Sequence, residues 1–509
     1  MLGSPPQSDA GSLGPGALHM ATPYRARHAH SRRSLATLEN VSDPNRMSDP
    51  VASAGAAPGT FRVRILRAGG WTVVGHVGTQ FLRLVSNLIM TRLLLPQMFG
   101  VMAVANVVLT GLNLVSDLGV SQNIVQHRRG ADAAYLNTAW TTQILRGGVI
   151  WVGCLLFAAG LKLVDVFHLI GAGTTYAQPG LPALIAGVSF YGLVGGFNST
   201  KIATANRSLA LSRLVQIDIY SQLSALCVMV VWALLSPTAW ALVGGGIVSS
   251  LTRLALSHFF LPGERNRLHW DREAFHDIFS FGKWIFVTSI LGFLAANGDR
   301  IILGGLVDAN TLGVYVIAAF MISAINQIFQ RLTNNVAFPA LAEVARDRPA
   351  DLRRTYYKFR APLDVSSLLA TGLLFSAGDL LVRILYNHRY QAAGHMMEIL
   401  SVGIFEVRYG LVAACMMALG KPRLLAPVIF VQLLVLLLVP PAYHRFGMDG
   451  ALWVIAASYL CTMPVTFYMK ITHGLLDLRK ELIVLPCVPI GYFAGIALNK
   501  LAELLWLAR

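Results

Sequence analysis

Several stretches of this chain are uncharged and long enough to cross a lipid bilayer as helices. Residues 309–330, 424–443 and 450–469 contain no Asp, Glu, Lys or Arg. A spanning helix needs about 20 apolar residues, because the hydrocarbon core is roughly 30 Å thick. A longer uncharged stretch, 219–252, is interrupted by a Ser-Pro pair, which predicts two helices joined by a tight turn. The pattern therefore predicts an all-α polytopic membrane protein.

The same pattern predicts thirteen spanning helices with mostly short connections. They lie near residues 72–94, 99–120, 138–161, 181–200, 214–235, 239–260, 281–303, 311–332, 362–385, 395–419, 424–443, 450–469 and 482–506. Composition agrees, because charged residues make up 13% of the chain, about half of the ~25% usual in soluble domains. The mean hydropathy is +0.58. A large soluble protein would need far more polar surface, so that class is excluded.

Basic residues are concentrated in alternate connections between the predicted helices. Connections such as 346–360 are rich in Arg and Lys, whereas those on the opposite side carry mostly single basic residues. The positive-inside rule makes the basic side cytoplasmic, which places the N-terminus in the cytoplasm. The formal net charge of +16 is therefore a topology signal, and no nucleic-acid partner is expected.

A short phrase occurs twice in the chain, each time at the start of a predicted span. Residues 97–105 read QMFGVMAVA and residues 310–318 read NTLGVYVIA, with glycine and valine at matching places. The two spans are six crossings apart, so both halves enter the membrane in the same sense. This predicts two six-helix lobes related by a pseudo-twofold axis along the membrane normal, plus a C-terminal helix. The predicted segments are a disordered cytoplasmic N-terminus (1–60), the first lobe (61–262), a cytoplasmic linker (263–280), the second lobe (281–470) and the additional C-terminal helix (471–509).

Several chemistries have no signal in the sequence. The five cysteines all fall in apolar stretches without a Cys-x-x-Cys pair, so neither a zinc site nor a disulfide framework is indicated. A phosphate-binding Gly-x-x-x-x-Gly-Lys-Ser/Thr motif does not occur in the chain. The largest outer connection, 162–180, offers only Lys162, Asp165 and His168 as chemical groups. No catalytic residue, metal or cofactor is therefore expected, and the protein is predicted not to be an enzyme.

Charged residues inside predicted spans are the informative polar groups. A charge at mid-bilayer costs about 2.5–3.5 kcal/mol on insertion scales, so it faces a cavity or a partner. The residues well inside the spans are Arg83, Arg146, Arg253, Glu406 and Arg408; those nearer the ends are Asp117, Asp218, Asp299, Arg300, Arg331 and Asp364. Arginine outnumbers acid at depth, which favours a cavity for an anion, because guanidinium binds phosphate in bidentate geometry. Two alternatives remain open: internal pairing, as for Arg408, and snorkelling to the headgroups for Asp218, Arg331 and Asp364.

Motifs in both halves resemble those of the polysaccharide transporter family, the O-antigen and exopolysaccharide flippases. In the first half these are TRLLLP at 91–96, Phe99-Gly100 and DLGVS at 117–121. The second half is more similar. Its motifs are Phe281-Gly282, DRIILG at 299–304, LGVY at 312–315 with Ala318, and FPAL at 338–341. The resemblance covers about 62–480. Many members of the family have twelve or fourteen spans, so the thirteen spans predicted for this chain differ from that pattern.

The resemblance implies a fold shared with multidrug-and-toxin extruders (MATE) and lipid II flippases. It implies an alternating-access flippase in the bacterial inner membrane that moves undecaprenyl-diphosphate-linked oligosaccharide for O-antigen, exopolysaccharide or capsule synthesis. A polysaccharide polymerase and a chain-length regulator are the expected partners. The expected anion-binding residues are Arg83, Arg146, Arg253, Arg300 and Arg331; the residues expected to couple H⁺ or Na⁺, or to pair with those arginines, are Asp117, Asp299 and Glu406. The alternatives are a cation-coupled drug or metabolite antiporter of the same fold and a membrane-embedded polymerase or glycosyltransferase.

Overall fold

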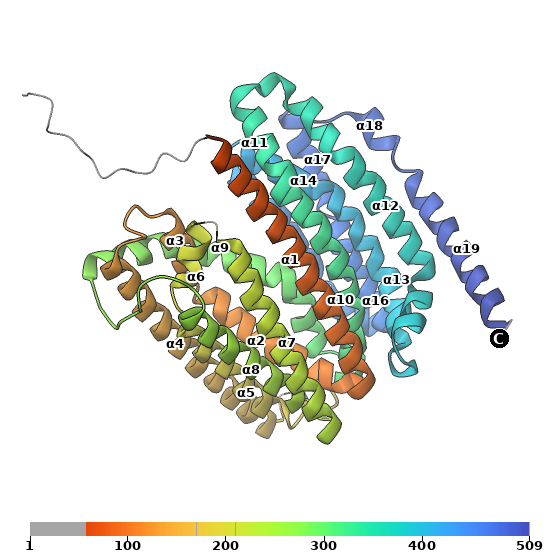
Figure 1. Cartoon of the computed structure of the whole chain (residues 1–509). Helices are drawn as coiled ribbons and strands as arrows, with labels where there is room; N and C mark the ends of the chain where they lie inside the picture. The colour runs from red at the N-terminus through yellow and green to blue at the C-terminus, as the bar shows by residue number, and fades with distance from the viewer. Residues whose placement is uncertain (1–57, 169, 209, 508–509) are drawn as a thin grey trace, which may run out of the picture. The chain divides into compact units, whose positions relative to one another are not determined.

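The computed structural model describes residues 58–168, 170–208 and 210–507, and the regular structure of these residues is helical throughout (Figure 1). Residues 1–57 of the segment predicted to be disordered lie outside the described residues. The all-α prediction is confirmed for the part of the chain that the structure describes.

The first half of the chain forms eight helices. They are α1 (Pro58–Leu93), α2 (Pro96–Val115), α3 (Val120–Gln126), α4 (Ala133–Val166), α5 (Leu181–Gly196), α6 (Lys201–Arg207), α7 (Leu211–Leu235) and α8 (Trp240–Phe259). We call the end of the bundle where α1 turns into α2 the hairpin end. The opposite end, where residues 260–271 connect α8 to the next long helix, is the linker end.

The second half contains the remaining helices. They are α9 (Arg272–Gly304), α10 (Ala309–Leu332), a π-helical turn (Thr333–Ala337), α11 (Phe338–Asp347), α12 (Leu352–Leu385), α13 (Ala392–Ser401), a 3₁₀ turn (Val402–Glu406), α14 (Val407–Ala418), α15 (Ala426–Leu436), α16 (Val439–Leu460), α17 (Met463–Thr472), α18 (Leu478–Leu482) and α19 (Cys487–Leu507). Each predicted span coincides with one of these helices or with a consecutive pair.

Short polar residues determine where several long helices begin. The carboxylates of Asp132, Asp271 and Asp308 accept hydrogen bonds from the first free amides of α4, α9 and α10. Such caps satisfy backbone donors that have no partner within the helix. Pro96 occupies the first turn of α2, where its missing amide costs nothing. The turns between apolar stretches are therefore encoded locally.

Nine helices in the described residues are apolar and long enough to cross a membrane, or ten if α5 and α6, bent by 61° at a break, form one span. Gly447 has a backbone φ of 67° inside α16, which divides it where the sequence predicts a connection between 424–443 and 450–469. The number of crossings and the lobe boundaries at 61–262 and 281–470 stay predictions.

The two copies of the repeated phrase contact each other through their glycines. A Cβ atom on Gly100 would overlap the carbonyl oxygen of Ala309 and lie 2.9 Å from the amide nitrogen of Gly313. A Cβ atom on Gly313 would overlap the carbonyl oxygen of Pro96 and lie 3.1 Å from the amide nitrogen of Gly100. Ala309 is the counterpart of Pro96 in the repeat, so the contact is reciprocal, as at a local twofold axis. The twofold relation of the whole halves stays a prediction.

Glycines also allow other helices to approach closely. Gly372 of α12 faces the carbonyl oxygen of Val488, and Gly491 of α19 faces that of Leu369. The Ser376 hydroxyl donates to the Tyr492 carbonyl over 2.9 Å, which ties α19 to α12 further. These two helices run alongside each other in Figure 1. The Gly-x-x-x-Gly pair at 491 and 495 therefore mediates close packing of α19 on α12.

The substitution Gly313→Ala is expected to lower stability, because the new methyl group has no room against the Pro96 carbonyl. Overpacking of this kind costs about 1–3 kcal/mol. The matched control is Gly148→Ala in α4, where a Cβ meets no atom within 4 Å. Thermal unfolding of the detergent-purified protein should show a lower midpoint for Gly313→Ala only. Equal midpoints for the two variants would contradict the close approach.

Candidate functional site

Hydrogen bonds connect the two halves at the hairpin end. The Thr175 amide and hydroxyl both donate to the Val307 carbonyl over 2.9 Å. The Tyr176 hydroxyl donates to the Ile301 carbonyl over 2.9 Å. From the second half, the Tyr390 hydroxyl donates to the Leu94 carbonyl over 3.0 Å. The halves are therefore closed against each other at this end by hydrogen bonds to backbone carbonyls.

Deeper in the bundle, α1 contacts α10 through two amides. The Gln80 amide nitrogen donates to the Gln327 side-chain oxygen over 2.8 Å. Arg83 is three residues beyond Gln80 on α1, and Arg331 is four residues beyond Gln327 on α10. Residues at these spacings share a helix face. The helices run in opposite directions, so the two arginines lie on either side of the amide pair.

Arg83 and Arg331 differ from the other predicted arginines in having no side-chain partner. Arg83 is exposed and Arg331 is partly exposed. Neither guanidinium makes a hydrogen bond or an ion pair with another residue in the described part of the chain. Two cationic groups are therefore free to bind an anion on the helices that connect the halves.

Arg146 is bound within the first half. Its guanidinium donates to the Asn113 carbonyl over 2.7 Å and to the Ser116 hydroxyl over 3.2 Å. Asp117 lies 3.6 Å away, so the structure brings these two predicted residues together as an ion pair. They adjoin a polar cavity of about 170 Å³ lined by Gln143 and by glycines of α4 and α5. Arg146 has fewer free donors for a ligand than Arg83.

Arg253 is also paired in the first half. Its guanidinium donates to the Asp218 carboxylate over 2.6 Å and joins α8 to α7. Both side chains are roughly half exposed, so this is a partly solvated ion pair. The structure does not bring Arg253 near another predicted site residue among those described.

Asp299, Arg300 and Glu406 share one region of the second half. The Tyr315 hydroxyl donates to one oxygen of Asp299. The other Asp299 oxygen and the Arg300 Nε atom are buried without a partner among the described residues. Tyr459 lies within electrostatic range of Asp299, Arg300 and Glu406. Asp299 and Tyr315 are therefore in direct contact, and Arg300, Glu406 and Tyr459 lie in the same region.

A second polar group in this half was not predicted from the sequence. Arg360, Arg408 and Lys470 have side-chain exposures of 1%, 2% and 0%, and all three contact the Glu481 carboxylate. The Arg360 guanidinium donates to Glu481 over 2.6 Å, and Asp364 lies 3.0 Å from the same guanidinium. We call these five residues the Glu481 cluster. It joins α12, α14 and α17 to α18.

The Glu481 cluster corrects two sequence-based expectations. Asp364, expected to reach the headgroups, is instead buried and paired with Arg360 and Arg408. Arg360 and Lys470, counted as charges of cytoplasmic connections, are buried inside the helix packing. The alternative that Arg408 pairs with an acid on a neighbouring helix is confirmed. The lone Glu directly after the basic pair Arg479-Lys480 was the available signal.

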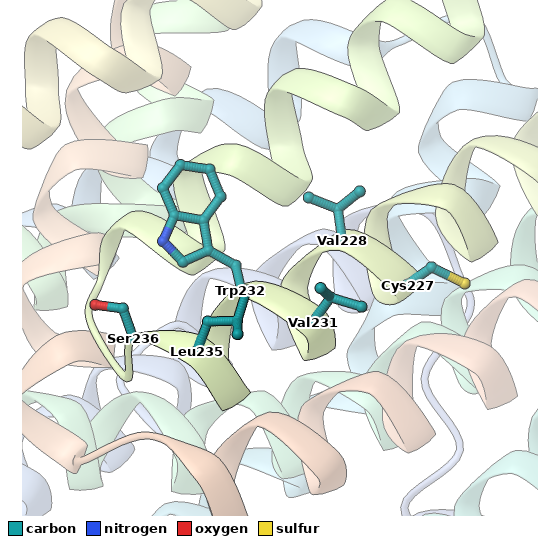
Figure 2. Close-up of a pocket in the computed structure, with 6 residues that line it drawn as sticks. All are labelled: Cys227, Val228, Val231, Trp232, Leu235 and Ser236. Atoms are coloured by element: carbon teal, nitrogen blue, oxygen red, sulfur yellow. The ribbon is translucent and has the colours of Figure 1, made fainter.

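An apolar hollow on α7 is a poor candidate for an anionic ligand. Figure 2 shows its lining, which includes Cys227, Val231, Trp232 and Leu235, all from one helix. Its volume is about 380 Å³, and none of its lining residues carries a charge. Such a surface suits an acyl chain of the bilayer and offers no group to bind a phosphate.

The substitution Glu481→Gln is expected to destabilise the protein strongly. It leaves three buried cations with Asp364 as the remaining carboxylate of the cluster. Removing one partner of a buried ion pair typically costs about 3–5 kcal/mol. The control is Asp347→Asn, which breaks the exposed pair with Arg346 and should change the thermal midpoint little. A wild-type midpoint for Glu481→Gln would contradict the pairing.

Comparison with known proteins agrees with this architecture. A family model described as "Polysaccharide biosynthesis protein" matches residues 89–394, more than half of the chain. The lipopolysaccharide biosynthesis protein WzxC of Escherichia coli (strain K12) is 21% identical over 344 residues, which are 67% of each chain. The succinoglycan biosynthesis transport protein ExoT of Rhizobium meliloti (strain 1021) is 23% identical over 288 residues, which cover 56% of this chain and 55% of ExoT.

Solved structures share the fold. The lipid II flippase MurJ in an inward closed conformation has a TM-score of 0.60 at 12% identity, covering 83% of this chain and 91% of MurJ. An inward-facing multidrug resistance MATE transporter has a TM-score of 0.56 at 12% identity, covering 78% and 94%. The MATE-like fold and the family resemblance predicted from the sequence are both confirmed. This chain is a multi-pass membrane protein and belongs to the polysaccharide biosynthesis protein family.

Proposed function

We propose that this protein is a flippase for an undecaprenyl-diphosphate-linked oligosaccharide used in surface polysaccharide synthesis. The family and the transport function named for ExoT support a role in glycan export. The fold is that of MurJ, whose name states that it flips a lipid-linked substrate. On this proposal the protein performs no covalent chemistry and moves its substrate by alternating access.

The observation that carries the proposal is the pair of unpaired arginines on α1 and α10. A diphosphate carries several negative oxygens, and guanidinium groups bind such oxygens in bidentate geometry without losing their charge. Arg83 and Arg331 come from different halves and lie on either side of the Gln80–Gln327 bond. An anion bound between them would contact both halves and would be released when the halves separate.

The contacts between the halves support a direction of access. In the described residues, hydrogen bonds close the hairpin end. At the linker end the first-half helices pair with the start of α9, through Arg129 and Glu273, but no hydrogen bond or ion pair joins them to α10–α17. The basic connections lie at the linker end, which we assign to the cytoplasm of a bacterial inner membrane. The structure would then receive substrate from the cytoplasmic leaflet. The N-terminus would be cytoplasmic, and a polysaccharide polymerase and chain-length regulator would act on the exported product.

The acids around Tyr459 are the proposed site of ion coupling. A buried Asp299 oxygen without a partner can accept a proton or contribute to Na⁺ coordination, since hard cations prefer oxygen ligands. Glu406 supplies a second carboxylate within range of the same tyrosine. When Asp299 binds a proton or Na⁺, its carboxylate would no longer balance the positive charge of the neighbouring Arg300. Such a site would link ion binding to the position of α9 and α10.

The substitution Arg83→Ala is expected to reduce polysaccharide export at least tenfold, because a charge-assisted bond to phosphate is lost. Arg331→Ala should have a similar effect. The matched control is Arg92→Ala, an exposed arginine at the hairpin end of the same helix. The measurement is surface polysaccharide in a gene deletion complemented with each variant, with the lipid-linked intermediate assayed in the inner leaflet. Normal export by Arg83→Ala would exclude its role, and drug efflux without a polysaccharide defect would favour an antiporter.

The substitutions Asp299→Asn and Glu406→Gln are expected to abolish the response of transport to an imposed ion gradient. The measurement is flipping of a fluorescent undecaprenyl-diphosphate sugar in proteoliposomes with an H⁺ or Na⁺ gradient in either direction. Asp347→Asn, which changes an exposed acid, serves as the control. If the wild-type rate is independent of both gradients, the coupling role of these acids is excluded while the flippase function stands.

A further inference from the structure

A groove of about 910 Å³ lies at the linker end of the first half, and none of its lining residues belongs to the predicted substrate residues. Trp140 of α4 and His258 of α8 line it side by side, with ring centroids 6.1 Å apart. Phe197, Lys201 and Arg265 of the linker also line it. The groove thus occupies the level where two membrane helices end and the connecting segment begins.

One wall of the groove is apolar and faces outward. Leu251, Leu254 and Phe259 follow one another along the last turns of α8. Phe259 is 88% exposed and Leu251 is 44% exposed, although both are large apolar side chains. Such side chains at the end of a membrane helix contact acyl chains. This wall therefore fits the upper part of a lipid tail.

The groove is also lined by basic side chains and contains no acid among its lining residues. Arg265 is exposed and has no side-chain partner in the described part of the chain. The His258 Nε2 atom donates to the Phe197 carbonyl over 2.9 Å, which fixes the imidazole in the groove lining. The Trp140 indole donates to the same carbonyl over 3.1 Å, so its ring is fixed beside the imidazole.

Lys201 removes an electrostatic obstacle to an anion at this place. The C-terminal end of a helix carries partial negative charge, which would repel a phosphate beside the last turn of α8. The Lys201 ammonium donates to the His258 carbonyl over 3.0 Å and to the Leu261 carbonyl over 3.2 Å. The helix end is thereby neutralised by a buried cation, and Arg265 adds net positive charge.

The linker that carries Arg265 is held in place by hydrogen bonds. The Asn266 side chain accepts from the Ser199 hydroxyl and donates to the Thr200 hydroxyl, both over 2.6 Å. The Arg267 amide donates to the Asn137 side chain over 2.9 Å. A fixed backbone reduces the entropy lost when the arginine binds a ligand.

From these features we propose that the groove binds an anionic phospholipid, with its phosphate at Arg265 and a tail along Leu251, Leu254 and Phe259. The absence of acids in the lining disfavours the ammonium of a zwitterionic headgroup, and the apolar wall disfavours a soluble anion. Basic pockets at the ends of membrane helices are suited to such headgroups. The assignment to the cytoplasmic leaflet rests on the proposed orientation, but the binding itself does not depend on flipping.

The test is lipid binding to the full-length purified protein in detergent, followed by native mass spectrometry. Titration with phosphatidylglycerol should show one site that binds about tenfold more tightly than phosphatidylcholine, the effect expected for one charge-assisted contact. Arg265→Gln should remove this preference. The control is Arg423→Gln, an exposed linker-end arginine outside the groove, which should retain it.

A second variant tests the groove by its shape, without changing its charge. Ala255→Trp fills the groove from an exposed position of α8 and should exclude phosphatidylglycerol without disturbing buried packing. Equal binding of phosphatidylglycerol by wild type, Arg265→Gln and Ala255→Trp would overturn the proposal. Competition by inorganic phosphate at equal affinity, or preferential binding of undecaprenyl diphosphate, would also overturn it by identifying another occupant. Disulfide cross-linking of two copies of the Phe259→Cys variant would also overturn the proposal, because a second copy of the protein would then occupy the groove.

Discussion

The close approach of Gly100 and Gly313 is the contact on which the arrangement of the two halves depends. It brings α2 against α10 with backbone nearly touching backbone, at matching positions of the repeat. The hydrogen bonds of the hairpin end surround this contact and require the same spacing. At the two glycines themselves backbone meets backbone, which resists separation and leaves few obstacles to rotation at that point. The same place can therefore hold the halves together and let them tilt.

Charges in this protein are divided between two environments. The cations of the Glu481 cluster are buried and form ion pairs with Asp364 and Glu481. These pairs stabilise the packing of α12, α14, α17 and α18. Arg83 and Arg331 have no such partners, and Asp299 has one oxygen without a partner among the described residues. Because unpaired charge within a membrane protein is costly, its retention at these sites is consistent with ligand binding. The position of a charged residue within its predicted span did not distinguish the two environments.

Local features of the sequence predicted the helices. Which charged residues come together depends on how the helices pack. The spans follow from apolar stretches and from caps such as Asp308, which act within a few residues. The repeat indicated equivalent helices, but the contact between Gly100 and Gly313 depends on how each helix is rotated. Asp299 and Glu406 meet at Tyr459 only after distant helices have packed. Glu481 was missed because it follows two basic residues in a segment that hydropathy assigns to a connection.

The position of Glu481 in the chain has a consequence for biosynthesis. Arg360, Arg408 and Lys470 are all made before it, with Asp364 as the other acid of their cluster. During synthesis, α12, α14 and α17 therefore enter the membrane with excess positive charge that cannot yet be buried. Their packing becomes favourable only after residue 481 has left the ribosome and α18 has reached its place. The packing of α12, α14 and α17 around these charges is therefore completed only when the segment after α17 is in place.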